Sequence, residues 1–305
     1  MYSWQHFVWL GISILLIGLC FYIFRFNPKT KKMSLTNFLY FSSAFVFIQE
    51  LIQMMAMMNF LPYAYGNEHN VGGVVHYAPY FDPRDFPLHL CSIQFIFLFL
   101  AARQKDENKR KKILSFFFPT ATFGAFIALV MSNVFTIKND PNWMSQCFIS
   151  PVFYSFFLIH AYLLFCGIFI ATDKRIDFHF KDCLSGMFTM ECLGFFSLMV
   201  NSMVTVVNRD PDNYLTPTEI VSNANLFFTS DLPIDIVITE KWQWILYFAI
   251  LFVLVICIFV LFFLPFYFLK DRKNKKKNTQ SNVDGIPQAI ESPVDFKEND
   301  KENHI

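Results

Sequence analysis

The stretch DFPLHLCSIQFIFLFLAAR, residues 85–103, joins a polar segment to an apolar one. It places Asp85, His89 and Cys91 directly ahead of the apolar run Phe95–Ala102. Such a run is typical of a helix embedded in a membrane, where a polar side chain is costly unless it is paired or serves a function. We therefore expect a functional site where this helix enters the bilayer.

If the whole stretch were helical, its polar side chains would divide between two faces, because residues two apart on a helix point in nearly opposite directions. Asp85, His89 and Ser92 would share one face, and Cys91 and Gln94 would share the other. This pattern predicts that His89 and Cys91 do not face the same pocket.

The composition excludes an ordinary soluble domain. Of the 305 residues, 54% are hydrophobic and only 16% are charged, and phenylalanine occurs 41 times. The seven cysteines show no C-x-x-C spacing, which argues against a zinc or redox motif, and no nucleotide-binding motif is present. We therefore predict an all-α, polytopic membrane protein that has membrane lipids as partners and binds no metal, cofactor or nucleic acid.

Apolar segments divide the chain into seven predicted spans of a transmembrane bundle. The bundle is expected to cover residues 1–270, followed by a cytoplasmic tail over residues 271–305 that is basic at first and then disordered. The predicted spans are Phe7–Phe24, Ser34–Phe60, Pro87–Arg103, Ile113–Val134, Phe148–Ala171, Leu184–Val207 and Trp242–Leu269.

The distribution of Lys and Arg orients these spans, because short cytoplasmic loops are enriched in basic residues. Basic residues gather after the first, third, fifth and seventh spans, for example in Arg110–Lys112 and Lys275–Lys277. The linkers after the other three spans contain only Arg84, Lys138, Arg209 and Lys241. We therefore predict a multi-pass protein of the cell membrane with its amino terminus outside and its carboxy terminus in the cytoplasm.

Several polar residues inside the predicted spans lie at a similar depth. With a rise of 1.5 Å per residue, Glu50 and Asn201 lie about 24 Å from the cytoplasmic edge, in the outer half where Cys91 also enters. His160 is expected about 18 Å below the outer surface, and it meets Cys91 only if the third span starts below that surface or Pro151 displaces the fifth. A site open to the exterior requires such a convergence.

Two stretches of the chain resemble the YwaF family of bacterial integral membrane proteins. The segment Phe86–Ser92, FPLHLCS, is similar to the family's Leu-Pro-Leu-His-Leu-Cys signature, which is the specific part of the resemblance. Ser150 and Pro151, followed by His160, are similar to the family's fifth span.

Further stretches add to the resemblance and also depart from it. Asn223–Phe228 resembles the family's Asn-Tyr segment, and Trp242–Ile245 resembles its Trp-Pro-Trp-Tyr turn. Leu226 follows Asn225 where the family has Tyr, and Asn208–Ile220 looks like an insertion. A distant animal relative of similar motif is a transmembrane acyltransferase that moves fatty acyl chains onto ether lysophospholipids with a Cys and a His, so the resemblance implies these roles for Cys91 and His160.

The first functional hypothesis is acyl transfer or hydrolysis on a membrane lipid. A neighbouring imidazole would favour the thiolate of Cys91, which would attack an ester carbonyl. His160 is the preferred base, and His89 is a weaker candidate because of the helical geometry. The residues expected to bind the substrate or to stabilise its oxyanion are Asp85, Glu50, Asn201 and Asn225.

Two hypotheses of other classes stay open. A transporter or binding protein for a small solute would line its path with polar residues of several spans, namely Glu50, His160, Glu191 and Asn201. A structural membrane protein would have no small-molecule site. For Cys91 itself, a disulfide with Cys147 is the alternative to a reactive thiol, because both lie at predicted outer helix ends.

Overall fold

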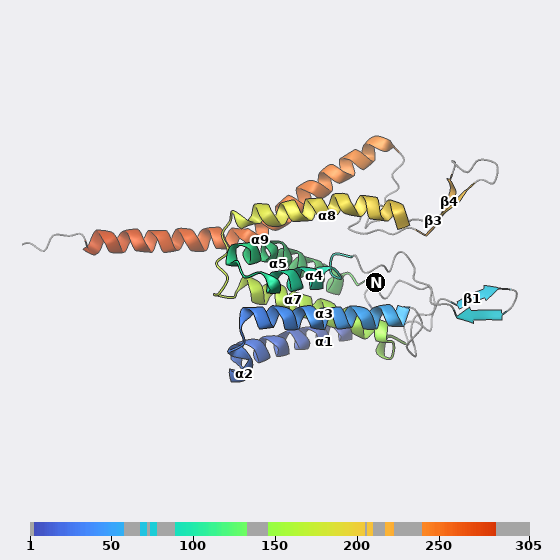
Figure 1. Cartoon of the computed structure of the whole chain (residues 1–305), viewed down its shortest axis with the longest axis horizontal. Coiled ribbons are helices and arrows are strands. Elements are labelled where there is room, and N and C mark those ends of the chain that lie inside the picture. The colour runs from blue at the N-terminus through green and yellow to red at the C-terminus, as the bar shows by residue number, and fades with distance from the viewer. Residues whose placement is uncertain are drawn as a thin grey trace, which may run out of the picture. The chain divides into compact units, whose positions relative to one another are not determined.

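A computed structural model describes residues 3–57, 68–71, 74–77, 89–132, 146–204, 206–209, 217–222 and 240–284 (Figure 1). In this part of the chain, six helices are long and apolar enough to cross a membrane, and a shorter apolar helix, α4 (Gln94–Arg103), accompanies them. The prediction of a helical, polytopic membrane protein is therefore confirmed. Its orientation in the bilayer stays a prediction.

The helices follow the apolar segments of the sequence. α1 (Trp4–Phe21) begins after Ser3, whose hydroxyl accepts a hydrogen bond from the His6 N–H at 3.3 Å. After α1 come a π-helical turn, η1 (Tyr22–Phe26), and the short α2 (Pro28–Lys31). The remaining helical elements in chain order are α3 (Leu35–Met57), α4, α5 (Glu107–Val130), η4 (Gln146–Phe148), α7 (Pro151–Ala171), α8 (Asp182–Val204) and α9 (Lys241–Asp284).

The third predicted span differs most from expectation. The sequence suggested a helix over residues 87–103, whereas α4 covers only Gln94–Arg103 and rises about 15 Å, half the thickness of a bilayer core. Its carboxyl end reaches the basic linker before α5, so its amino end lies inside the bundle. The chain segment ahead of α4 thus enters the membrane region in a non-helical form, which is tolerated only where protein surrounds it.

Two short antiparallel hairpins stand in the linkers on the other side of the bundle. β1 (Glu68–Val71) pairs with β2 (Val74–Tyr77), and β3 (Val206–Arg209) pairs with β4 (Pro217–Ser222). The two ends of the stretch Asn208–Ile220 that looks like an insertion lie in β3 and β4. The helical bundle itself is all-α in the residues that the structure describes.

α7 lies at the centre of the helix packing. It contacts α1, α3 and α5, while α4 lies against both α3 and α5, and α8 lies against α5 (Figure 1). At Gly167 the backbones of α7 and α5 approach so closely that an added Cβ would overlap the Thr122 side chain and lie 3.1 Å from the Phe118 carbonyl oxygen. The outer helices α1, α8 and α9 expose large apolar side chains, including Leu15, Phe188 and Ile245, as lipid-facing helices do.

The chain divides into two compact units, Met1–Leu264 and Pro265–Ile305. The boundary falls inside α9 at Pro265, which removes a backbone hydrogen-bond donor from the helix. α9 continues to Asp284, so residues 278–284 are helical where the sequence predicted the start of a disordered segment. The remainder of the predicted tail, residues 285–305, lies outside the described residues.

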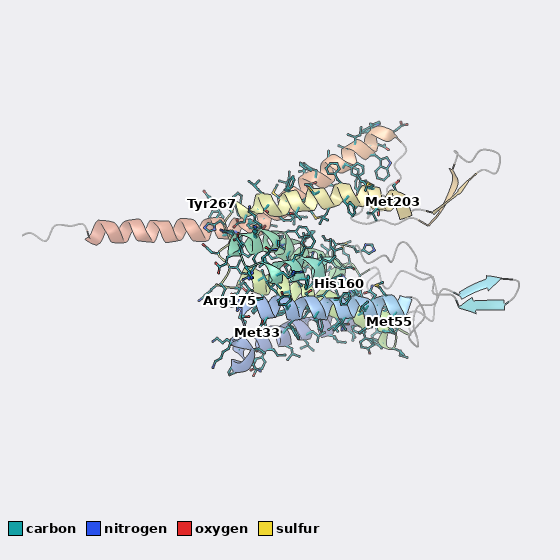
Figure 2. The ribbon with its side chains drawn as sticks, in the orientation of Figure 1. Met33, Met55, His160, Arg175, Met203 and Tyr267 are labelled. Carbon is teal, nitrogen blue, oxygen red and sulfur yellow. The ribbon has the colours of Figure 1, made fainter. Side chains whose placement is uncertain are left out.

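A cluster of ionic contacts closes the end of the bundle that we predict to be cytoplasmic. The Arg175 guanidinium donates to the Asp173 carboxylate at 3.0 Å and to the Met33 carbonyl oxygen at 2.8 Å. Figure 2 shows Met33 and Arg175 together at this end. These bonds join the loop after α7 to the segment ahead of α3.

Two further contacts cross between segments at the same end. Arg25 donates to the carbonyl oxygen of Thr172 at 3.1 Å and to its hydroxyl, so η1 is joined to the end of α7. Lys111 of α5 lies 3.4 Å from the carboxylate of Asp182 at the start of α8. Basic residues at this end thus form hydrogen bonds and an ion pair between helices, in addition to their predicted role in orienting the chain.

Asp173 gives this end a testable dependence on pH. Burial raises the pKa of its carboxyl, but hydrogen bonds and charge from Arg175 outweigh burial and hold the pKa below its usual value. The resulting stabilisation is complete above the unfolded-state pKa of about 3.9 and is lost as pH falls through the lower folded-state pKa. We expect Asp173→Asn to reduce the free energy of unfolding by about 1 kcal/mol at pH 7 and by less below pH 3.

Thermal unfolding in detergent at the two pH values measures this difference. Asp177→Asn is the matched control, because Asp177 belongs to the same loop and its side chain is 84% exposed. A loss of stability that is as large in the control, or that does not shrink at acid pH, would contradict the role given to Asp173.

Candidate functional site

The signature residues His89–Ile93 form a tight turn ahead of α4. The Ile93 N–H donates to the His89 carbonyl oxygen at 3.0 Å, and the Gln94 N–H donates to the Cys91 carbonyl oxygen at 3.3 Å. Neither His89 nor Cys91 belongs to the α-helix, so the condition on which the prediction of two helix faces rested is not met. The physical reason is the shorter i to i+3 bond at Cys91, which removes the regular spacing on which that prediction depended.

Hydrogen bonds attach both the turn and the start of α4 to α3. The Ser92 hydroxyl forms a hydrogen bond with the Glu50 carboxylate, and the Ser43 hydroxyl donates to the Phe95 carbonyl oxygen at 2.8 Å. Glu50 is only 6% exposed, so its polar head is held inside the bundle with Ser92 as a partner. The position of the turn is therefore determined by α3 as well as by α4.

The Cys91 thiol rests against α5. Its Sγ lies 3.5 Å from the place where a Cβ would stand on Gly124, so the glycine provides the surface on which the sulfur packs. The thiol also lies close enough to Glu50 to interact with it electrostatically. Cys91 is thus in van der Waals range of one helix and in electrostatic range of another.

The disulfide considered for Cys91 does not form. Both Cys91 and Cys147 are free thiols. Cys147 is fully buried in an apolar cluster that includes Trp9 and Phe153, away from the polar turn. The thiol of Cys91 is therefore available for chemistry.

His160 of α7 has a defined tautomer. Its Nδ1 lies 2.6 Å from the Phe156 carbonyl oxygen. Because a carbonyl oxygen only accepts, Nδ1 carries the proton and Nε2 of the neutral ring has the lone pair of a base. The ring packs on Phe156 with centroids 4.3 Å apart.

His160 lies within electrostatic range of the turn. His160 interacts electrostatically with His89. Figure 2 shows His160 near the middle of the bundle, between Arg175 at one end and Met55 at the other. The third span begins deep in the bundle, at Gln94, which is the condition under which the sequence allowed these residues to meet.

Gln94 is a buried polar residue to which the sequence assigned no role. It is fully buried, and its Nε2 donates to the Thr120 hydroxyl at 3.0 Å. Its Oε1 has no hydrogen-bond partner in the residues that the structure describes. Its position three residues after Cys91 was visible in the sequence, but its partner on α5 was not.

Comparison with known families identifies the chain more closely. A model of the TMEM164 family matches residues 1–264. The chain belongs to the TMEM164 family. This match replaces the resemblance to the YwaF family as the description of the chain, and its last residue is the last residue of the first compact unit. No curated protein and no solved structure matches the chain.

Three other site residues were predicted for this TMEM164 family member, namely Asn201, Asp85 and Asn225. Asn201 lies on α8 and is 1% exposed. Asp85 and Asn225 lie outside the described residues, so their roles in substrate binding stay predictions. The described part of the candidate site is therefore formed by the turn together with residues of α3, α5 and α7: Glu50, His89, Cys91, Ser92, Gln94, Thr120, Gly124 and His160.

Proposed function

We propose that this protein transfers acyl groups from a membrane lipid, with Cys91 as nucleophile and His160 as base. The observation that carries the proposal is the turn His89–Ile93, which holds a free thiol against Gly124 while His89 in the same turn interacts with His160. A thiol and an imidazole with an unprotonated Nε2 are the two groups that nucleophilic acyl transfer requires. The resemblance to an acyltransferase of ether lysophospholipids supports the same chemistry.

The proposed reaction has two halves. In the first, His160 Nε2 takes the proton of the Cys91 thiol, the sulfur attacks the ester carbonyl carbon, and the carbon–oxygen bond breaks. The leaving oxygen takes the proton from His160, so a lysolipid and an acyl thioester on Cys91 result. In the second, the hydroxyl of an acceptor attacks the thioester, its proton passes through His160 to the sulfur, and the thiol is restored.

The remaining polar residues are proposed to bind and orient the substrate. Glu50 and Ser92 form a hydrogen-bonded pair beside the thiol, and their polar surface suits the glycerol region of a lipid. His89 interacts electrostatically with His160 and would orient that ring or the ester. Asn201 is proposed to donate a hydrogen bond to the developing oxyanion. Asp85 and Asn225 are proposed to bind the substrate.

An aromatic layer below the site favours an enzyme over a transporter. Phe38, Phe165 and Phe169 are buried, and their ring centroids lie 4.5–6.2 Å apart. A solute path needs polar groups through the whole depth of the bundle, whereas a site open to one leaflet needs them in one half only. The layer occupies the half of α7 between His160 and the predicted cytoplasmic end.

Trapping of the acyl-enzyme tests the proposal. Purified protein in nanodiscs is incubated with a phospholipid whose acyl chain is isotopically labelled, and the peptide that contains Cys91 is analysed by mass spectrometry. We expect the mass of one acyl chain on Cys91, removed by neutral hydroxylamine as a thioester is. An acyl chain that is absent from Cys91, or that resides on another residue, would refute the nucleophile assignment.

A further inference from the structure

The hydrogen bonds of Thr120 determine which way the Gln94 amide points. The Thr120 hydroxyl donates its single proton to a carbonyl oxygen of its own helix, that of Phe116 at 2.7 Å. Towards Gln94 the hydroxyl oxygen can therefore only accept, so the amide group that faces it is the Nε2 donor. The opposite amide atom, Oε1, is an acceptor that needs a donor from elsewhere.

The burial of Gln94 makes an unpaired Oε1 atom energetically costly. Gln94 is 0% exposed, and among the described residues nothing donates to its Oε1. A buried acceptor without a donor costs about 1–3 kcal/mol, which an apolar residue of similar size would avoid. A glutamine at this position is therefore most readily explained by a donor that arrives with the substrate.

Gln94 and the Cys91 thiol contact neighbouring positions on α5. Cys91 packs on Gly124 and Gln94 bonds to Thr120, two residues that stand one turn apart on the same face of α5, about 6 Å along its axis. An oxygen that attacks a thioester approaches within about 3–3.5 Å, and an O–H···O bond adds about 2.8 Å. The sum of these two lengths is similar to the spacing of Thr120 and Gly124 along α5.

We propose that Gln94 Oε1 binds the O–H group of the acyl acceptor in the second half-reaction, an inference that rests on the function proposed above. The hydroxyl oxygen attacks the carbonyl carbon of the Cys91 thioester, and the carbon–sulfur bond breaks. The proton of that hydroxyl passes to His160 Nε2 and then to the Cys91 sulfur. The products are an acylated acceptor and the free thiol.

The attacking hydroxyl can come from water or from a lipid, and the two differ in whether they can donate to Gln94 and His160 at the same time. Water carries two protons and can donate one to Gln94 and the other to His160 at the same time. A lipid hydroxyl carries one proton and has to leave Gln94 before that proton reaches His160. Loss of Gln94 is therefore expected to slow transfer to water more than transfer to a lipid.

The decay of the acyl-enzyme tests the inference. The wild-type protein and Gln94→Leu are acylated on Cys91 in nanodiscs, the labelled donor is removed, and decay of the thioester is followed by mass. One chase uses water enriched in ¹⁸O, and the other adds a lysophospholipid. We expect both proteins to form the acyl-enzyme equally and the thioester to decay at least tenfold more slowly in the variant. Incorporation of ¹⁸O into free fatty acid would show that water is the acceptor, and appearance of the labelled acyl chain in diacyl lipid would show that the lysophospholipid is.

Each outcome separates this inference from the proposed function. If the wild type forms no thioester on Cys91, the proposed function fails and the inference fails with it. If both proteins form the thioester and it decays at the same rate in both, only the role of Gln94 is overturned. Gln104→Leu, at the other end of α4, is the matched control and should decay as the wild type does.

Thr120→Val provides a second variant for the case in which Gln94→Leu does not fold. It removes the hydroxyl that holds the amide and leaves Gln94 in place. We expect slower decay of the thioester with unchanged formation, and Thr120→Ser, which retains the hydroxyl, should restore the decay. Wild-type decay in Thr120→Val would also contradict the proposal.

Discussion

Cys91→Ser is expected to lower lipid acyl turnover at least about a thousandfold. A hydroxyl is a much weaker nucleophile than a thiolate, and His160 as a neutral imidazole ionises it far less readily. The substitution preserves the size of the side chain, and the 3.5 Å approach to Gly124 leaves room for either atom. Thermal stability should therefore change little, and turnover is measured as release of labelled acyl product from phospholipid in nanodiscs.

Cys192→Ser is the control for the loss of a thiol. Cys192 is a free, exposed cysteine on α8, outside the turn that holds Cys91. Its substitution should leave turnover at the wild-type level. Turnover that persists in Cys91→Ser would end the assignment of the nucleophile, while solute uptake that persists in the same variant would favour the transporter hypothesis.

Gly186→Ala is expected to destabilise the bundle by about 3 kcal/mol. An added Cβ on this residue of α8 would lie 2.5 Å from the Ser115 carbonyl oxygen of α5 and 2.6 Å from Cε1 of Phe259 on α9. The carbonyl oxygen belongs to a helical backbone and cannot turn aside as a flexible side chain would. The helices have to separate instead, which costs more than the roughly 1 kcal/mol by which alanine exceeds glycine in helix propensity.

Gly194→Ala on the same helix has the opposite expected sign. A Cβ at Gly194 meets no atom within 4 Å, so only the gain in helix propensity remains, up to about 1 kcal/mol. The temperature of unfolding in detergent should fall for Gly186→Ala and rise slightly for Gly194→Ala. Equal changes in the two variants would show that close helix contact at Gly186 does not hold α8 to α5.

The sequence predicted the membrane-embedded elements well and the start of the third one poorly. Hydropathy over about twenty residues identifies a span reliably, because backbone groups in lipid have to bond within their own segment. At His89–Ile93 this argument loses its force, since a segment that packs against other helices does not need to be helical. The turn that holds Cys91 therefore could not be recognised from its residues alone.

The sequence also identified several members of the site without their mutual arrangement. His89, Cys91, Glu50 and His160 were selected because polar groups in a bilayer are costly. Gln94 was not selected, because only its hydrogen bond with Thr120 shows that its Oε1 is a buried acceptor. The pairing of residues from α3, α4, α5 and α7 depends on how the helices rotate about their axes, which no local pattern records.

By itself, the sequence determined that this chain is a multi-pass membrane protein, because the cost of moving polar groups into hydrocarbon imposes long apolar segments wherever the chain crosses. It also determined which costly polar residues those segments retain. Only the tertiary structure decided that the Cys91 thiol is free, that it lies on Gly124 near Glu50, and that His160 carries its proton on Nδ1. The physical reason is that such contacts join residues far apart in the chain, so they arise from close packing between helices and from competition among their hydrogen bonds.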